Sequence, residues 1–239
     1  MLVSTTTSIL QYPFLLAILT LKMELTPTTL EAIKTTLSAA RISTYEAVCS
    51  DSSSALALYA WNAQVSGALL TPLHICEVII RNAVSDALES IYGERWPWST
   101  GFERSLPDPA HGYSPTKDLQ NARRRVTTTG KVIPELKFVF WQKMFTRRYD
   151  TRLWNTHLMQ EFPNLDSTLP INDLRSNIYN ELEVIRRLRN RIAHHEPIFC
   201  RNLIDDFQNI TDLIHSRCGV TSTWMVNNQQ ALSIINSRP

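Results

Sequence analysis

The stretch that decides the fold is NDLRSNIYNELEVIRRLRNRIAHHEP, residues 172–197. Apolar residues recur in it every three or four positions, which predicts one long amphipathic helix from Asn172 to about His195. The apolar stripe of this helix consists of Leu174, Ile178, Leu182, Ile185, Leu188 and Ile192. Because Pro197 disfavours helical geometry at Glu196, we expect the helix to end just before that residue.

Helical periodicity continues over most of the remaining chain. The chain has 6 Gly against 12 Pro, and a β-sandwich or barrel would need more turn glycines. We therefore predict an all-α fold, a helical bundle of about eight helices. The other expected helices cover 28–38 with the capping box Thr28-x-x-Glu31, 52–70, Thr71 to Gly93 with Pro72 in its first turn, 115–130, 134–145, 152–162, 201–217 and 228–236. The long loop at 94–114 is expected to be a lid or a partner-facing segment.

Length and composition favour one helical domain over residues 23–239. The chain has 239 residues, of which 44% are hydrophobic. Residues 1–22 look like an over-extended start, because their apolar run is too short to span a bilayer and no Lys or Arg precedes it. Four cysteines without Cys-x-x-Cys spacing indicate reduced thiols in a cytosolic protein and no structural zinc.

The end of the long helix carries the chemically most informative residues. Arginines cluster at Arg186, Arg187, Arg189 and Arg191, and two histidines follow directly. A guanidinium fits a phosphate with a fork of donors, and an imidazole can both take and give a proton near neutral pH. A net charge of +2 is too small to indicate nucleic-acid binding by itself, so any basic surface must be local. The segment therefore predicts RNA cleavage, with Arg186, Arg187 and Arg191 as RNA-binding candidates.

Arg189 falls within the apolar stripe, whereas Asn190 and His194 share another side of the helix. One interpretation is that Arg189 extends from the core edge or pairs with a carboxylate. The other is that this face meets a second copy of the chain, which places Arg189 and a histidine in a cleft. Asn190 is positioned to fix the imidazole tautomer of His194, and His195 remains an alternative working histidine.

A second group lies on the helix expected to begin at Thr71. Glu77 and Arg81 are one turn apart in the favourable order for an ion pair, and Glu77 borders the apolar stripe. A plain structural pair is one interpretation, and a role in holding Arg189 or a histidine is the other. Two further basic clusters, at 123–125 and 147–148, are expected to be solvated faces, with contact to an RNA backbone as the alternative.

The segment Arg189-Asn190-Arg191-Ile192-Ala193-His194 matches the R-x4-H pattern, with Asn after the Arg, of the HEPN superfamily of ribonucleases. The longer string to Phe199 resembles the Abi-like (AbiD/AbiF) branch of that superfamily. Further blocks of the resemblance are Leu58-Tyr59-Ala60-Trp61-Asn62, Glu77-x-x-x-Arg81-Asn82-Ala83, Tyr92-Gly93 and Phe140-Trp141. Together these blocks span roughly residues 40–215 in the family's order.

This resemblance implies a HEPN-type helical bundle with additional peripheral helices, a homodimer with two facing motifs, and metal-independent endoribonuclease activity. Arg189 and His194 would be catalytic and Asn190 would support them. Further supporting candidates are His195, Glu77, Arg81 and Glu196. Members of the family act as toxins or abortive-infection components in phage defence, and some are restrained by a small antitoxin RNA. The implied partners are RNA and a second copy of the chain in the cytoplasm, with an antitoxin protein as a second choice of regulator, no membrane and no cofactor.

Two other classes of function are open to these residues. A non-catalytic RNA-binding or regulatory module would use the arginines for phosphate and the histidines for structure. A metal enzyme using His194, His195 and Glu196 is disfavoured, because adjacent residues on a helix point about 100° apart and no His-x-x-x-His pattern is nearby. An intramembrane protease would need several long apolar spans.

Overall fold

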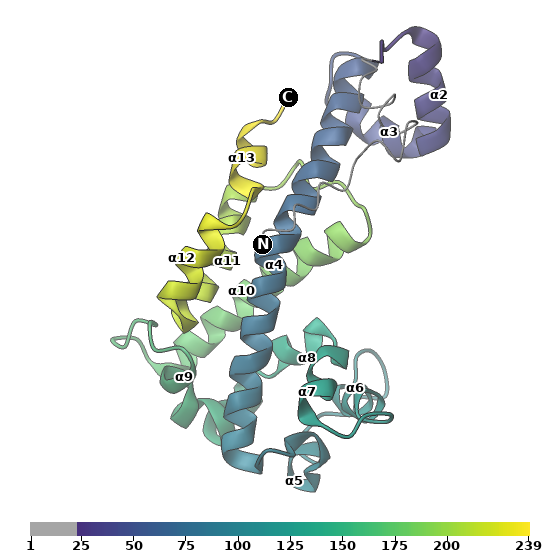
Figure 1. Ribbon diagram of the computed structural model, residues 1–239. Helices are drawn as coiled ribbons and strands as arrows, with labels where there is room; N and C mark the ends of the chain where they lie inside the picture. Colours follow the sequence, from purple (N-terminus) through teal and green to yellow (C-terminus); the bar gives the residue numbers. More distant parts are fainter. Residues whose placement is uncertain (1–22) are drawn as a thin grey trace, which may run out of the picture. The chain divides into compact units, whose positions relative to one another are not determined.

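The computed structural model describes residues 23–239, and every regular element in that range is helical. The expected all-α fold is confirmed, with twelve α-helices among the described residues where about eight were expected. The elements are α2 (Pro27–Leu37), α3 (Ala39–Glu46), α4 (Ser52–Tyr92), η2 (Trp96–Trp98), α5 (Thr100–Glu103), α6 (Pro115–Ala122), α7 (Thr129–Val132), η3 (Ile133–Glu135), α8 (Phe138–Lys143), η4 (Arg147–Tyr149), η5 (Asp150–Trp154), α9 (Asn155–Glu161), α10 (Ile171–Ala193), α11 (Leu203–Arg217), α12 (Gly219–Asn227) and α13 (Ala231–Asn236) (Figure 1). Residues 1–22, where we expected an over-extended start, lie outside the described residues.

The chain divides into two compact units, with the boundary between residues 59 and 60 inside α4. A single domain was expected over residues 23–239. In the first unit α2 packs against α3. The N-cap of α2 is Thr26, whose hydroxyl accepts from the Thr29 amide, so the capping box expected at Thr28 and Glu31 is wrong. Proline at the first helical position selects this earlier start, because its missing N–H costs nothing there.

Helix α4 is continuous across Pro72, which we had expected to begin a separate helix. Proline removes one helical hydrogen bond, at a cost of about 3 kcal/mol, but its fixed φ is compatible with a helix. Burial of Leu69, Leu73 and Cys76 on either side of Pro72 offsets this cost. By length and composition α4 could cross a membrane, with a mean hydropathy of 1.4 over its most apolar window. It is the only such helix among residues 23–239.

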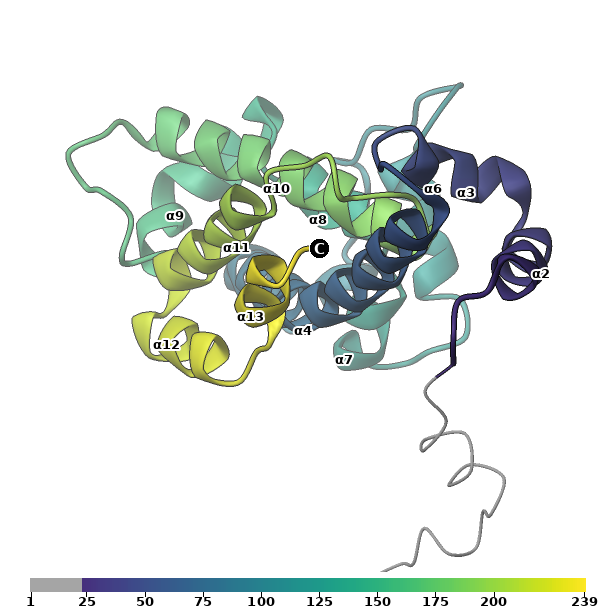
Figure 2. The same ribbon diagram turned by 90° about the horizontal axis from the view of Figure 1, so that it is seen from above.

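The core of the second unit lies around α10, which packs against α8, α9 and α11 (Figure 2). Its predicted apolar stripe is confirmed, since all six of its residues are buried. The four residues expected on one face of α11 are also buried: Leu203, Phe207, Ile210 and Ile214. Side chains of α4 reach the same core, and Trp61 donates from its ring nitrogen to the Ile234 carbonyl at 2.7 Å. Helix α10 is thereby held on several sides, and its C-terminal end occupies a defined place.

The segment at 94–114 is not a free loop. It contains η2 and α5, and the side chains of Trp96 and Phe102 are fully buried. Their rings meet edge to face at 5.3 Å, and the Trp96 ring nitrogen donates to the Ser85 hydroxyl at 3.1 Å. Aromatic side chains of this size bury enough area to hold an otherwise irregular segment in place. The expectation of a lid is therefore wrong for the part that contains Trp96 and Phe102.

The helices expected over 115–130 and 134–145 are shorter than predicted. Helix α6 ends at Ala122, and Pro134 lies within a short 3-10 turn. Arg123 follows α6 and donates to the Pro97 carbonyl and the Glu103 carboxylate, so tertiary contacts set the end of this helix.

We predict that Glu181→Gln stabilises the protein at alkaline pH. Burial raises the pKa of Glu181 from 4.5 to about 7, and the negative charge of Asp212 adds to this effect. The native state therefore binds the proton more tightly than the unfolded state. Its stability relative to the unfolded state falls as the pH rises from 4.5 through 7. At pH 8 the variant should gain about 2 kcal/mol and a melting temperature roughly 4–8 °C higher, with no gain at pH 4.

The control for this thermal-melting series is Glu89→Gln, which changes an exposed carboxylate elsewhere in the same unit. Equal gains in both variants at pH 8, or a gain from Glu181→Gln that is the same at pH 4 and pH 8, would contradict the assignment.

Candidate functional site

Glu77, Arg81 and Arg189 form one charged cluster between α4 and α10. Glu77 pairs with Arg81 one turn along α4, and its other carboxylate oxygen lies 3.9 Å from Nε of Arg189. The Glu77 side chain is 15% exposed, whereas that of Arg189 is 43% exposed. Of the two interpretations of Arg189, pairing with a carboxylate is the one observed in the single chain. Two guanidinium groups share one carboxylate, so the cluster keeps a net positive charge.

The two histidines have different structural positions at the end of α10. The helix ends at Ala193, with His194 as its C-cap. His195 has a φ of 55°, in the left-handed region that glycine normally occupies after a helix. The His195 amide donates to the Ile192 carbonyl at 3.1 Å, and the Glu196 amide donates to the Arg191 carbonyl at 2.8 Å. These are the two hydrogen bonds of a Schellman motif, so His195 occupies the turning position and His194 continues from the helix.

Arg191 and Glu196 hold this turn together. Nε of Arg191 lies 3.4 Å from a carboxylate oxygen of Glu196, and a terminal nitrogen of Arg191 donates to the Pro197 carbonyl at 3.0 Å. Arg191, which the sequence suggested as an RNA-binding residue, therefore has a local structural partner. The helix ends at Ala193, two residues before the end that we expected from Pro197.

Asn62 attaches the turn to α4. Its side-chain oxygen accepts from the Ile198 amide at 2.8 Å, and both residues are buried. Asn62 lies in one of the sequence blocks that resemble the HEPN family, but its role could not be inferred, because nothing in the local pattern pairs it with a residue 136 positions away. Through this bond α4 fixes the backbone directly after the two histidines and Pro197.

Arg186 and Arg187 both pair with Glu183. The guanidinium of Arg186 forms two hydrogen bonds to this carboxylate at 2.8 and 3.0 Å, and Arg187 donates to it at 2.8 Å. Hydrogen bonding from Arg186 is the main cause that lowers the pKa of Glu183 to about 2, with Gln142 and Arg187 adding to it. The three charges sum to +1, so this part of α10 is less basic than its sequence suggests.

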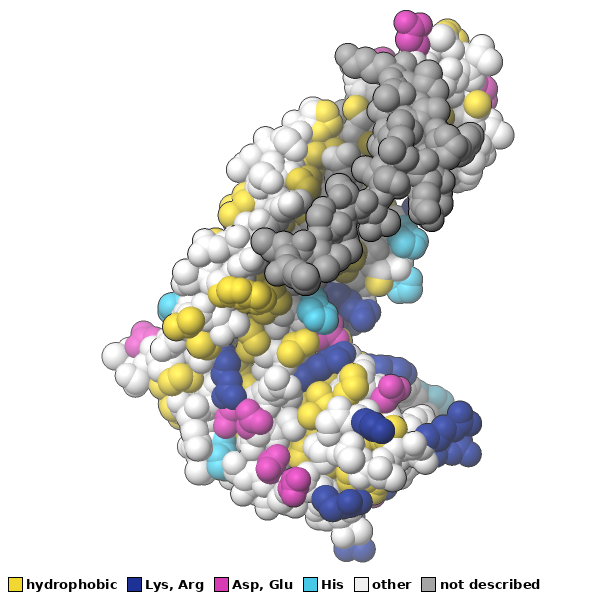
Figure 3. All heavy atoms as spheres, in the orientation of Figure 1, with side chains coloured by type: hydrophobic (Ala, Val, Ile, Leu, Met, Phe, Trp, Pro, Cys, Tyr) yellow, Lys and Arg dark blue, Asp and Glu magenta, His cyan; other side chains and the backbone are white. Residues whose placement is uncertain are grey.

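The described chain does not bring all the predicted site residues together. No hydrogen bond or ion pair within residues 23–239 joins Arg189 to His194, and none joins the side chains of Asn190 and His194. His194 is exposed and Asn190 is partly exposed. Figure 3 shows a face on which Lys and Arg side chains are interspersed with Asp, Glu and His. The arrangement offers an anchored guanidinium and a solvent-accessible imidazole at one end of α10.

His74 is one of four histidines of the chain that lie outside the motif. It is exposed on α4, three residues before Glu77. Residues three apart on a helix lie on neighbouring parts of its surface. This spacing puts His74 and Glu77 on the same side of α4.

A metal centre has no support in the described part of the chain. It contains no group of three or more His, Cys, Asp or Glu side chains placed to hold an ion. All four cysteines are free thiols. The residues that are clustered here are mainly arginines, which bind anions rather than cations.

Comparisons with known proteins found no match. No protein-family model, curated protein or solved structure matches this chain.

We predict that Asn62→Ala destabilises the turn after α10. The substitution leaves the buried Ile198 amide without its acceptor, which should lower the free energy of unfolding by about 1–3 kcal/mol in urea denaturation. Hydrogen exchange at the Ile198 amide should accelerate at the same time. Asn121→Ala, at an exposed helical position, is the control and should change neither quantity. Unaltered exchange at Ile198 in the Asn62 variant would refute this role of Asn62.

Proposed function

We propose that this chain is a metal-independent endoribonuclease of the HEPN type. The observation that carries the proposal is that α10 presents a partly exposed, carboxylate-anchored Arg189 and an exposed His194, five residues apart, at its C-terminal end. The spacing and the neighbouring Asn190 match the motif of that superfamily. Neither side chain is enclosed in the core, so both are available to a substrate from solvent.

The proposed reaction is attack of a ribose 2′-hydroxyl on the adjacent phosphorus. His194 takes the proton of the attacking hydroxyl or gives one to the leaving 5′-oxygen, and Arg189 stabilises the charge that develops on the phosphoryl oxygens. The bond from phosphorus to the 5′-oxygen breaks as the bond to the 2′-oxygen forms. DNA lacks the attacking hydroxyl, so the proposed substrate is RNA.

We propose a homodimer as the active form. Arg189 and His194 are separated on the helix by about 140°, so one chain directs them to different sides. A second copy packed against the C-terminal end of α10 would bring two sets of these groups to one groove. The proposed biological role is that of a cytoplasmic toxin or abortive-infection effector in phage defence, with a small antitoxin RNA as its restraint.

A non-catalytic RNA-binding or regulatory module is the second candidate function. The observation that favours it is that no hydrogen bond or ion pair within residues 23–239 joins Arg189 to His194, so the described chain does not itself assemble the two catalytic candidates. Such a module would bind RNA without cleaving it.

We predict that Arg189→Ala and His194→Ala each reduce RNA cleavage by at least 100-fold. The Arg189 variant would no longer stabilise the charge on the phosphoryl oxygens, and the His194 variant would no longer transfer the proton. Loss of either electrostatic stabilisation or acid–base catalysis typically slows a reaction by about 100-fold or more. The measurement is digestion of a labelled RNA by purified protein with EDTA present. Both variants should stay folded, because both side chains are at the surface.

The matched controls are Arg104→Ala and His111→Ala, and a third variant, His195→Gly, tests the alternative histidine. The first two remove exposed side chains outside the site, and the third restores the residue that a left-handed turn favours. All three should cleave RNA as wild type does. Full cleavage by either test variant would contradict the proposed mechanism, and loss of cleavage in His195→Gly alone would move the proton-transfer role to His195.

A further inference from the structure

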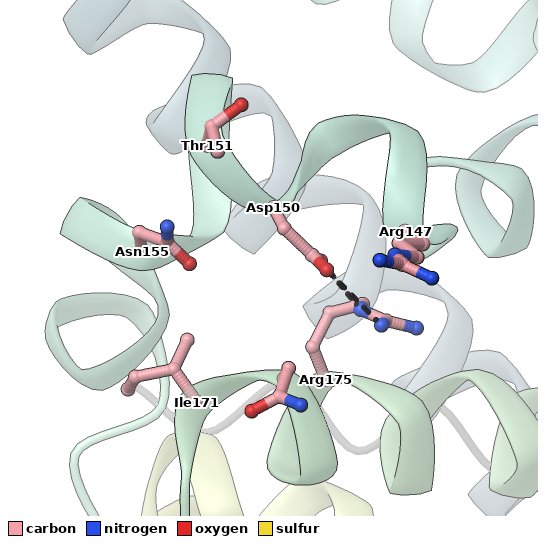
Figure 4. Close-up of a pocket in the computed structure, with 7 residues that line it drawn as sticks. Arg147, Asp150, Thr151, Asn155, Ile171 and Arg175 are labelled. Atoms are coloured by element: carbon pink, nitrogen blue, oxygen red, sulfur yellow. Dashed lines mark hydrogen bonds and ion pairs between the residues drawn. The ribbon is translucent and has the colours of Figure 1, made fainter.

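A cavity of about 620 Å³ lies outside the site, at the N-terminal end of α10. It is lined by residues of η4, η5, α9 and α10 (Figure 4). A volume of this size suits a small ligand such as a nucleotide. One wall of the cavity is the π-helical turn η5, an irregularity that proteins often keep at functional sites.

One side chain that lines the cavity, Arg175, is buried and is held in place by the carboxylate of Asp150. Arg175 is only 8% exposed, and it donates to both carboxylate oxygens of Asp150, at 2.8 and 3.3 Å, and to the Phe145 carbonyl at 3.1 Å. An arginine has five N–H donors, so these three bonds leave two without an acceptor. Asp150 compensates the charge of Arg175, and no carboxylate of the described chain pairs with the second cavity-lining arginine, Arg147.

The cavity is also rich in hydrogen-bonding groups that no other residue uses. Figure 4 shows Arg147 near the Asp150–Arg175 pair, with Thr151, Asn155 and Ile171 around the remaining wall. Within residues 23–239 the side chains of Arg147, Thr151, Asn155 and Asn172 have no hydrogen-bond partner. The backbone amides of Ile171 and Asn172 also lack an acceptor, because Pro170 caps α10 without a side-chain bond. The lining therefore offers mainly donors around one uncompensated positive charge.

We propose that this cavity binds a phosphate group of a nucleotide, with Arg147 as the main cationic contact. A guanidinium matches a phosphate with two donors, and the positive end of a 23-residue helix adds to the attraction. The carboxamides of Asn155 and Asn172 can donate to the same phosphate or to the edge of a base.

The geometry of α10 favours an RNA chain as the source of this phosphate. Asn172 and Asn190 are 18 residues apart, which is five full helical turns, so both lie on one face about 27 Å apart. Lys143 reaches that face between them, where it donates to the Tyr179 hydroxyl at 3.0 Å. A stacked strand of about eight nucleotides spans this length. The RNA source rests on the proposed function, whereas the phosphate site itself does not.

The test measures how tightly the 239-residue protein binds three ligands. They are AMP and two 2′-O-methyl RNA oligonucleotides, of 5 and 14 nucleotides. These oligonucleotides lack the attacking hydroxyl, so cleavage cannot interfere. Arg147→Ala should weaken binding of the 14-mer about 5-fold or more and reduce its salt dependence by about 0.7 in the log–log slope, the contribution of one phosphate contact. Arg104→Ala, an exposed arginine outside the cavity, should change affinity less than 2-fold.

Each outcome separates the possibilities. An effect of Arg147→Ala on the 14-mer beyond that on the 5-mer supports an RNA chain that reaches along α10. An effect on AMP alone supports the site with a free nucleotide as its ligand. No greater effect from Arg147→Ala than from Arg104→Ala on any of the three ligands overturns the proposal. If wild type fails to cleave RNA while binding still depends on Arg147, the proposed function fails and the phosphate site stands.

Discussion

The shared carboxylate of Glu77 is the interaction on which the candidate site depends. It holds Arg81 on its own helix and approaches Arg189 on α10, so it links the two longest helices of the second unit. A carboxylate shared by two guanidinium groups fixes their positions but compensates only half of their charge. The remaining positive charge is what a phosphate would meet. Partial burial of Glu77 limits solvent screening and so strengthens its attraction for the two guanidinium groups.

The backbone conformation after Ala193 determines the positions and the exposure of the two histidines. The left-handed conformation of His195 ends the helix and turns the chain, while Asn62 fixes the next segment to α4. As a result, His194 lies at the end of the helix and its side chain is exposed. A strained conformation at a non-glycine residue persists only where its surroundings enforce it, and such positions are common at functional sites. The proposed proton transfer by His194 and the turn at His195 are therefore two parts of one local structure.

Hydrophobic periodicity predicted the amphipathic helices. It failed where tertiary contacts determine the bounds of a helix or the path of a loop. The stripes of α10 and α11 were found because their apolar residues repeat every three or four positions. The break expected at Pro72 was wrong, since burial around it outweighs the lost hydrogen bond. The burial of Trp96 and the pairing of Asn62 with Ile198 could not be foreseen, because both depend on residues distant in the chain. At the site, the motif supplied the candidate residues, but it could not show that Arg191, Arg186 and Arg187 have partners of their own.

The measurement that tests the central claim most directly is identification of the RNA ends left by the wild-type protein in the presence of EDTA. If an imidazole and a guanidinium drive attack by the ribose hydroxyl, the products carry 2′,3′-cyclic phosphate and 5′-hydroxyl ends. Products with 5′-phosphate ends, or cleavage that disappears with the chelator, would show that water and a metal ion perform the reaction instead.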